Sequence, residues 1–284
     1  MRSSLVRQAI TPLRSVYASS IVAPEAVAAM TALGLDGQQG YFAVRTAALG
    51  VVPLEVVRSL FFGHSPRYIK AAGEGVWDKT TPTEVLDAIR VSLHLSLGKA
   101  FEEIGAPAAE LTGMLRIAAE RASTRPEGRA LFAANASLTW PSEPHLQLWH
   151  AHVLLREWRG DGHNALLVGQ SIDGLAALVL HAAWAGMPLG AIAGSRQWTP
   201  EECEPAIAGL QARGWLTEGA DPVISPAGKA ARDAIEDATD DADAFAYETF
   251  SDDELARLVE LAAVVGEGVA DRVVRPGQNP APRS

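Results

Sequence analysis

Residues 199–217 read TPEECEPAIAGLQARGWLT, and this stretch decides the fold expected for the C-terminal third of the chain. Thr199 suits a helix cap and Pro200 the first helical position, while Glu202 can reach back to the cap with its carboxylate. Gly214 is placed to end the helix. The segment therefore predicts one well-capped helix.

The flanking segments extend this helix into a larger motif. A short helix is expected over residues 188–196, ahead of the capped one. Two short strands at 215–217 and 222–225 are expected to flank a turn at 218–221, and Pro226 then opens a long helix. This order predicts a winged helix, that is, a helix-turn-helix followed by a small β-wing.

Two motifs in this region carry a resemblance to a known family. LxxRGWLT at 210–217 and ISPAGKAxRD at 224–233 resemble the recognition helix, wing and following helix of MarR-type regulators. More widely, the chain resembles an actinobacterial helix-turn-helix family of largely uncharacterised proteins, through GYFAVRTAALG (40–50), LWHAHVLLREWRGDGHNALL (148–167) and GWLTEGADPVISPAGKAARD (214–233). The resemblance implies a MarR-like C-terminal region and brings no established activity.

The charge of the capped helix argues against DNA reading. Between residues 199 and 228 the basic residue is Arg213, and the acidic residues are Glu201, Glu202, Glu204, Glu218 and Asp221. A recognition helix reads bases near its N-terminal end, and phosphate contacts need basic side chains or backbone amides. The whole chain carries a net charge of -10. We therefore expect a scaffold or dimer platform, with duplex DNA as a disfavoured partner.

The rest of the chain is predicted to be helical, which makes the protein mainly α. Hydrophobic residues make up 48% of it and aromatic residues 6%, so Ala, Leu and Val must build the core. We expect an N-terminal helical domain over 1–125, central helices over 130–186, the winged helix and C-terminal helices over 187–270, and a disordered tail over 271–284. The apolar spacing at 255–265 predicts a dimer seam, and so a homodimer.

Several classes of protein are disfavoured. No uncharged apolar run reaches the ~20 residues of a membrane span, and the N-terminus lacks a secretion signal, so a soluble cytoplasmic protein is expected. The single cysteine, Cys203, precludes an internal disulfide. Neither a nucleophile elbow nor a phosphate-binding loop is present, which argues against an enzyme. The sequence names no cofactor.

Four of the seven histidines lie between His145 and His163, and this region is the first candidate site. In a helix, His145, Trp149 and His152 share one face. Two turns separate the two histidines of that face, which is too far for both to bind one metal ion unaided. No metal site is predicted.

Residues 159–163, RGDGH, allow two interpretations. In the first they connect two helices, with Gly160 as a left-handed stop and Asp161 as the cap of the next helix. In the second they bind an anionic or aromatic ligand. The ligand-binding residues of this region would then be His145, Trp149, His152, Trp158, Arg159, Asp161 and His163.

A second polar and aromatic group lies in the N-terminal half. Its members are Tyr41, Arg45, Phe62 and His64. Core packing accounts for them as well as ligand binding does. In the ligand-binding interpretation, this group and the 145–163 region face one pocket.

These observations lead to one hypothesis and two alternatives. The leading hypothesis is a non-catalytic protein that binds a small, partly aromatic ligand and uses the winged helix as a scaffold. The first alternative is a MarR-like, ligand-responsive transcription regulator that binds DNA. The second is an enzyme acting on a specialised metabolite, with His163 or His152 as general acid or base.

Overall fold

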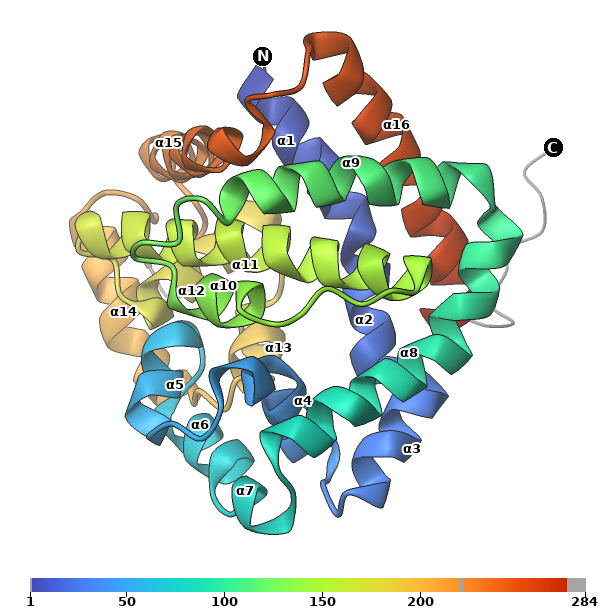
Figure 1. Cartoon of the computed structure of the whole chain (residues 1–284). Helices are drawn as coiled ribbons and strands as arrows, with labels where there is room; N and C mark the ends of the chain where they lie inside the picture. The colour runs from blue at the N-terminus through green and yellow to red at the C-terminus, as the bar shows by residue number, and fades with distance from the viewer. Residues whose placement is uncertain (1, 220–221, 275–284) are drawn as a thin grey trace, which may run out of the picture. The chain divides into compact units, whose positions relative to one another are not determined.

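Helices account for the regular structure of the chain. The computed structural model describes residues 2–219 and 222–274, and within these ranges no strand is formed (Figure 1). The prediction of a mainly α protein is confirmed. Among the same residues, no single helix combines the length and the apolar composition needed to cross a membrane. The chain divides into two compact units: Met1–Val51, Gly75–Asp161 and Asp240–Ser284 form unit 1, and Val52–Glu74 and Gly162–Thr239 form unit 2.

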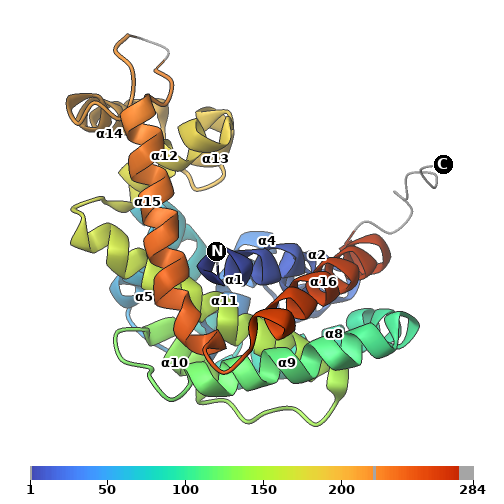
Figure 2. The same cartoon turned by 90° about the horizontal axis from the view of Figure 1, so that it is seen from above.

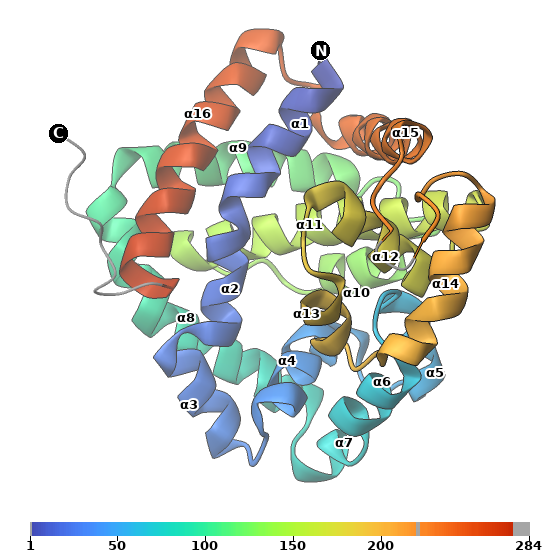
Figure 3. The same cartoon turned by 180° about the vertical axis from the view of Figure 1, so that it is seen from behind.

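Unit 1 is built from helices that come from all parts of the chain. Besides the first part of α11 (Pro144–Gly169) and the end of α15 (Pro226–Asp243), it contains α1 (Arg2–Ile10), η1 (Thr11–Leu13), α2 (Arg14–Val22), α3 (Pro24–Ala32), α4 (Gly37–Thr46), η2 (Ala47–Leu49), α7 (Val76–Lys79), α8 (Pro82–Ile104), α9 (Ala106–Ala122), α10 (Ala130–Ala136), η3 (Ala244–Tyr247), α16 (Asp252–Val269) and η4 (Ala270–Val274). Helix α16 packs along α1 and α9, and α3 packs along α8 (Figures 1 and 3). Segments at opposite ends of the sequence therefore share one core.

Helix α16 uses its apolar face inside unit 1. Leu255 and Leu258 are fully buried. Gly266 lets the backbone of Pro12 approach, since a Cβ on Gly266 would lie 2.3 Å from the Pro12 carbonyl oxygen. The apolar face of residues 255–265, from which a dimer seam was predicted, packs against α1 and α9 within unit 1, and the homodimer stays a prediction.

The end of the chain is described only in part. Residues 271–274, the first four of the predicted disordered tail, belong to η4, a short π-helix that continues directly from α16. The remaining tail residues, 275–284, lie outside the described residues.

Unit 2 contains the predicted helix-turn-helix. Its elements are α5 (Leu54–Leu60), α6 (Pro66–Gly73), the last part of α11, α12 (Gly174–Ala185), α13 (Leu189–Gly194), α14 (Pro200–Ala212) and the first part of α15. Helices α12, α13 and α14 lie together (Figure 2) and share a core of Leu178, Ala193 and Cys203. The predicted cap of α14 is confirmed: the Thr199 hydroxyl accepts a hydrogen bond from the Glu202 N–H, and the Glu202 carboxylate accepts one from the Thr199 N–H.

The segment after α14 differs from the prediction. Where two short strands were expected, the described residues form a single antiparallel bridge between Leu216 and Ile224. The prediction of a two-stranded β-wing is wrong here, because the facing segments are short and Pro222 has no N–H with which to extend the ladder. Residues 220 and 221 of the predicted turn lie outside the described residues.

Replacing Gly266 with alanine should destabilise unit 1. The new methyl group would meet the Pro12 carbonyl at 2.3 Å, and the Ser15 hydroxyl, which donates to the Gly266 carbonyl at 2.7 Å, holds the two segments at this separation. We expect the free energy of unfolding, measured by urea denaturation, to fall by about 1–3 kcal/mol. The matched control is Gly113→Ala in α9, where an added Cβ would meet no atom within 4 Å. This control should gain roughly 0.5–1 kcal/mol, since alanine favours helix, and a similar gain in Gly266→Ala would contradict the close packing.

Candidate functional site

Helix α11 runs through the RGDGH segment without a break. The interpretation of residues 159–163 as a connection between two helices is therefore wrong. Gly160 has no left-handed φ, so it does not stop the helix. Asp161 does not cap a new one: it is 7% exposed, and its carboxylate accepts a hydrogen bond from the Phe132 N–H at 3.0 Å. A partner from another helix of unit 1 satisfies this carboxylate, so the backbone of α11 can continue.

The predicted histidine face of α11 lies on the buried side of the helix. His145 Nε2 is 3.1 Å from Nδ1 of His94. Neither ring nitrogen of the fully buried His152 has a hydrogen-bond partner among the described residues. Burial, with a smaller contribution from Arg156, lowers the pKa of His152 to about 3. His152 is therefore neutral near pH 7 and unsuited to act as a general acid. Within the described ranges, no group of three or more His, Cys, Asp or Glu side chains could hold a metal ion.

Tyr41 and Arg45 meet α11 at a buried ion pair. Arg45 lies 3.3 Å from the Glu157 carboxylate, and Tyr41 hydrogen-bonds Arg45. Burial raises the pKa of the neighbouring Tyr17 to about 12, although the guanidinium of Arg156, 4.1 Å above the Tyr17 ring, acts in the opposite direction. The structure thus brings part of the N-terminal group to α11, as members of a buried charged cluster.

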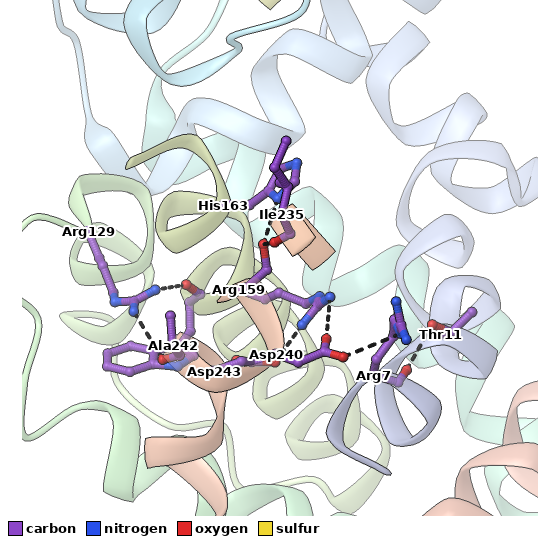
Figure 4. A network of polar contacts seen from close by, with 11 residues as sticks. Arg7, Thr11, Arg129, Arg159, His163, Ile235, Asp240, Ala242 and Asp243 are labelled. Carbon is purple, nitrogen blue, oxygen red and sulfur yellow. Dashed lines mark hydrogen bonds and ion pairs between the residues drawn. The ribbon is translucent and has the colours of Figure 1, made fainter. Parts of the chain in front are cut away.

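Arg159 belongs to a second buried charge network, shown in Figure 4. Its guanidinium points to Asp240 at 2.8 Å and to Asp243 at 3.4 Å, while Arg7 approaches Asp240 at 3.5 Å. Both aspartates are 1% exposed. Burial raises the pKa of Asp243 to about 7, with Arg159 acting in the opposite direction. These contacts hold α11, the end of α15 and α1 together within unit 1.

Trp158 is part of the same interior. It is 2% exposed, and the Arg129 guanidinium lies 3.7 Å from the centre of its ring. Arg129 also donates hydrogen bonds to the backbone carbonyls of Trp158 and Ala242. Trp158, Arg159 and Asp161 are therefore brought together, each of them engaged with other residues of unit 1.

The remaining predicted site residues, Phe62, His64 and His163, belong to unit 2. His163 Nδ1 lies 2.9 Å from the hydroxyl of Thr239, which itself donates to the Ile235 carbonyl (Figure 4). This bond joins α11 to α15. Phe62 and His64 have a different role, because both line a pocket.

The pocket of unit 2 has a volume of about 780 Å³. Three segments form its walls: α5 with the turn that follows it, the end of α11 with the start of α12, and the turn before α14. Sequence reasoning found Phe62 and His64 and missed the other principal lining residues, Arg58, Ser171, Asp173 and Trp198. The sequence allows Asp173 to be recognised as the N-cap of a helix. No feature of the sequence indicates that these three segments converge.

Close backbone contacts hold the segments that form this pocket in place. A Cβ on Gly174 would lie 1.8 Å from the Phe62 carbonyl oxygen, so only glycine allows α12 to begin at this place. The indole N–H of Trp198 donates to the Gly63 carbonyl at 2.9 Å. The turn after α5 is thereby clamped between α12 and the turn before α14.

Residues with an unusual backbone conformation cluster at the same pocket. Among the described residues, three that are not glycine have a positive φ: Phe62 (22°), Ser171 (54°) and Gln197 (57°). Phe62 and Ser171 line the pocket, and Gln197 directly precedes the lining residue Trp198. Such conformations cost free energy and persist where the surrounding structure holds them, which is common at functional sites.

Both ends of α14, the second helix of the helix-turn-helix, are held by hydrogen bonds from arginine side chains of unit 2. At the N-terminal end, Arg67 of α6 donates to the Glu202 carboxylate at 2.8 Å and to the Gln197 carbonyl at 2.6 Å. At the C-terminal end, Arg213 donates to the carbonyl of the pocket residue Ser171 at 2.8 Å. A basic side chain at each end of α14 is thus engaged within unit 2.

The pH dependence of stability should report on Asp243. Its pKa in the folded protein, about 7, lies above the ordinary value of 3.8, so the fold favours the protonated acid. The contribution of this group to stability is present below pH 4 and is lost as the pH rises to about 7. Asp243→Asn should remove this loss, so that its unfolding free energy falls less between pH 4 and pH 7 than that of the wild type. The exposed Asp241→Asn serves as the control, and parallel pH profiles for wild type and Asp243→Asn would contradict the assignment.

Comparison with known proteins adds one positive finding. No curated protein and no solved structure shows a significant match to the chain. The sequence profile of a helix-turn-helix family, in contrast, matches residues 6–276. The match covers both units, so the family is defined by the whole arrangement and not by α13 and α14 alone. The chain therefore belongs to a helix-turn-helix family.

Proposed function

We propose that this helix-turn-helix protein binds a small, partly aromatic molecule in the pocket of unit 2, and that its helix-turn-helix serves as structural support for that pocket. The observation that carries the proposal is the strained backbone. The three non-glycine residues with positive φ among the described residues lie in, or directly beside, one pocket. Ser171 and Gln197 follow the ends of α11 and α13, and Phe62 lies against Gly174, so the three positions fix the turns that form the pocket.

The size and chemistry of the pocket support a small molecule. Its volume of about 780 Å³ falls within the range of ~300–1,000 Å³ that is typical of small-molecule sites. Phe62 and Trp198 offer aromatic surface, His64 offers an imidazole ring, and Arg58 offers a guanidinium that is paired with the lining residue Glu55 at 2.8 Å. These side chains suit a ligand with an aromatic portion and a polar or anionic group.

The contacts of α14 favour a supporting role for this helix. A helix that enters the major groove presents its N-terminal turn to the bases. In this protein that turn carries Glu201 and Glu202, and Glu202 is held by Arg67. Arg213 supports the Ser171 carbonyl at the other end. The acidic residues are well explained as caps and as favourable partners of the helix dipole, and they disfavour contact with phosphates.

Filling the pocket should weaken the binding of an aromatic anion. Val168 lines the pocket and is 63% exposed, so Val168→Trp can occupy the opening without disturbing the core. We expect the wild type to bind 1-anilinonaphthalene-8-sulfonate with a rise in fluorescence, and Val168→Trp to bind it at least about tenfold more weakly, which corresponds to ~1.4 kcal/mol.

The control for this titration is Val91→Trp. Val91 is 61% exposed on α8 and does not line the pocket. The Val91→Trp substitution adds the same bulk and the same fluorophore to the surface. Equal affinities for the dye in wild type, Val168→Trp and Val91→Trp would show that the dye binds elsewhere and would count against the proposal.

The transcription-regulator alternative predicts a different result with DNA. Under our proposal, mixed-sequence and genomic duplexes bind the wild type weakly even at low salt, with a dissociation constant of about 10⁻⁶ M or weaker. The double variant Glu201→Lys, Glu204→Lys reverses two exposed charges on α14 and should bind more tightly, because it removes the repulsion of phosphates. Nanomolar, sequence-specific binding by the wild type, measured by fluorescence anisotropy, would favour the regulator instead.

A further inference from the structure

Unit 1 contains a separate cavity of about 240 Å³ between α8, the segment before α11, and α11 itself. Its walls are mainly apolar and include Leu86, Ile89, Leu93, Leu138 and Leu146. An engineered apolar cavity of about 150 Å³ is known to take up benzene, so this cavity has room for a larger aromatic compound.

Two of the lining residues, His150 and Trp149, have ring nitrogens in addition to apolar surface. His150 is 4% exposed, and its Nε2 has no hydrogen-bond partner among the described residues. The indole nitrogen of Trp149 also has no hydrogen-bond partner among the described residues. Buried ring nitrogens are nearly always hydrogen-bonded in folded proteins, because an unpaired one loses its hydration without replacement. Two such atoms lie on adjacent residues that line one cavity, which makes this cavity a candidate for a ligand.

The ring of His150 is held in place by its neighbours. Trp140 meets it edge to face, with ring centres 4.7 Å apart, and the Arg116 guanidinium lies 4.8 Å above the Trp140 ring. Burial lowers the pKa of His150 to about 4, so the imidazole is neutral near pH 7. A neutral imidazole can donate or accept one hydrogen bond and does not require a charged partner.

The charges around the cavity also favour an uncharged ligand. Arg90 is the charged residue among those that line it, and its guanidinium pairs with Asp87 at 2.9 Å. Both side chains are 58% exposed, so the pair is solvated. An ionised ligand group would lose its own hydration in this cavity without gaining a free countercharge.

We propose that this cavity is a second small-molecule site, for an uncharged, mainly apolar aromatic compound with one hydroxyl or carbonyl group that hydrogen-bonds His150. The proposal is independent of the unit 2 pocket, because it concerns different residues and a different class of ligand.

Calorimetry with 2-naphthol and naphthalene tests the hydrogen bond. Both compounds are uncharged and have the same fused rings, and only 2-naphthol carries a hydroxyl group. We expect 2-naphthol to bind the wild type about tenfold more tightly than naphthalene, as one well-formed hydrogen bond allows. His150→Phe keeps a ring against Trp140 and removes both nitrogens, so it should bind the two compounds equally. Failure of 2-naphthol to bind the wild type, or an unchanged preference in His150→Phe, would overturn the proposal.

Blocking variants locate the site. Leu86→Trp and Thr139→Trp each add bulk at a lining position, and either should abolish 2-naphthol binding. Thr139 is exposed, so its variant remains informative if Leu86→Trp fails to fold. Val168→Trp, which fills the pocket of unit 2, should leave 2-naphthol binding unchanged. Loss of 2-naphthol binding in Val168→Trp, with full binding in Thr139→Trp, would assign the compound to the other pocket and overturn the proposal.

Discussion

The contact between the Phe62 carbonyl and Gly174 sets the geometry of unit 2. No side chain fits at residue 174, so the turn after α5 lies directly against the first residue of α12. The backbone of Phe62 is forced to a positive φ in this position, and the Trp198 indole secures the following residue, Gly63. A pocket framed by backbone contacts of this kind is preorganised, because its walls cannot relax independently.

The helix-turn-helix of this protein shows which features belong to the fold itself. Its local structure follows the ordinary rules: a capping box starts α14, and Leu178, Ala193 and Cys203 form the core that it shares with α12 and α13. None of these features concerns DNA. A DNA reader also needs a basic surface, and in this protein Arg67 and Arg213, at the two ends of α14, donate hydrogen bonds within unit 2. The family membership therefore establishes the architecture, and the function rests on the site.

Unit 1 shows why polar residues that suggest a ligand site can be structural. Arg159 is matched by Asp240 and Asp243, Arg45 by Glu157, and Asp161 by the Phe132 N–H. A charge taken out of water is costly unless it is paired, so a buried charge requires partners at defined places on neighbouring helices. Such groups hold helices in register. In contrast, His150 and Trp149 carry ring nitrogens without partners among the described residues, which is why the cavity beside them is the better candidate for a ligand.

The sequence alone determined the features that depend on neighbouring residues. The cap at Thr199, the helix that follows it and the mainly α fold were predictable, because capping and periodicity act over a few positions. Gly160 and Asp161 misled the same reasoning, because the partner of Asp161 is Phe132, a residue distant in the chain. The covered face of α16 and the convergence of Phe62, Ser171 and Trp198 on one pocket were likewise decided by tertiary structure. Local rules describe what a segment prefers, whereas a pocket depends on which distant segments pack together to satisfy one another.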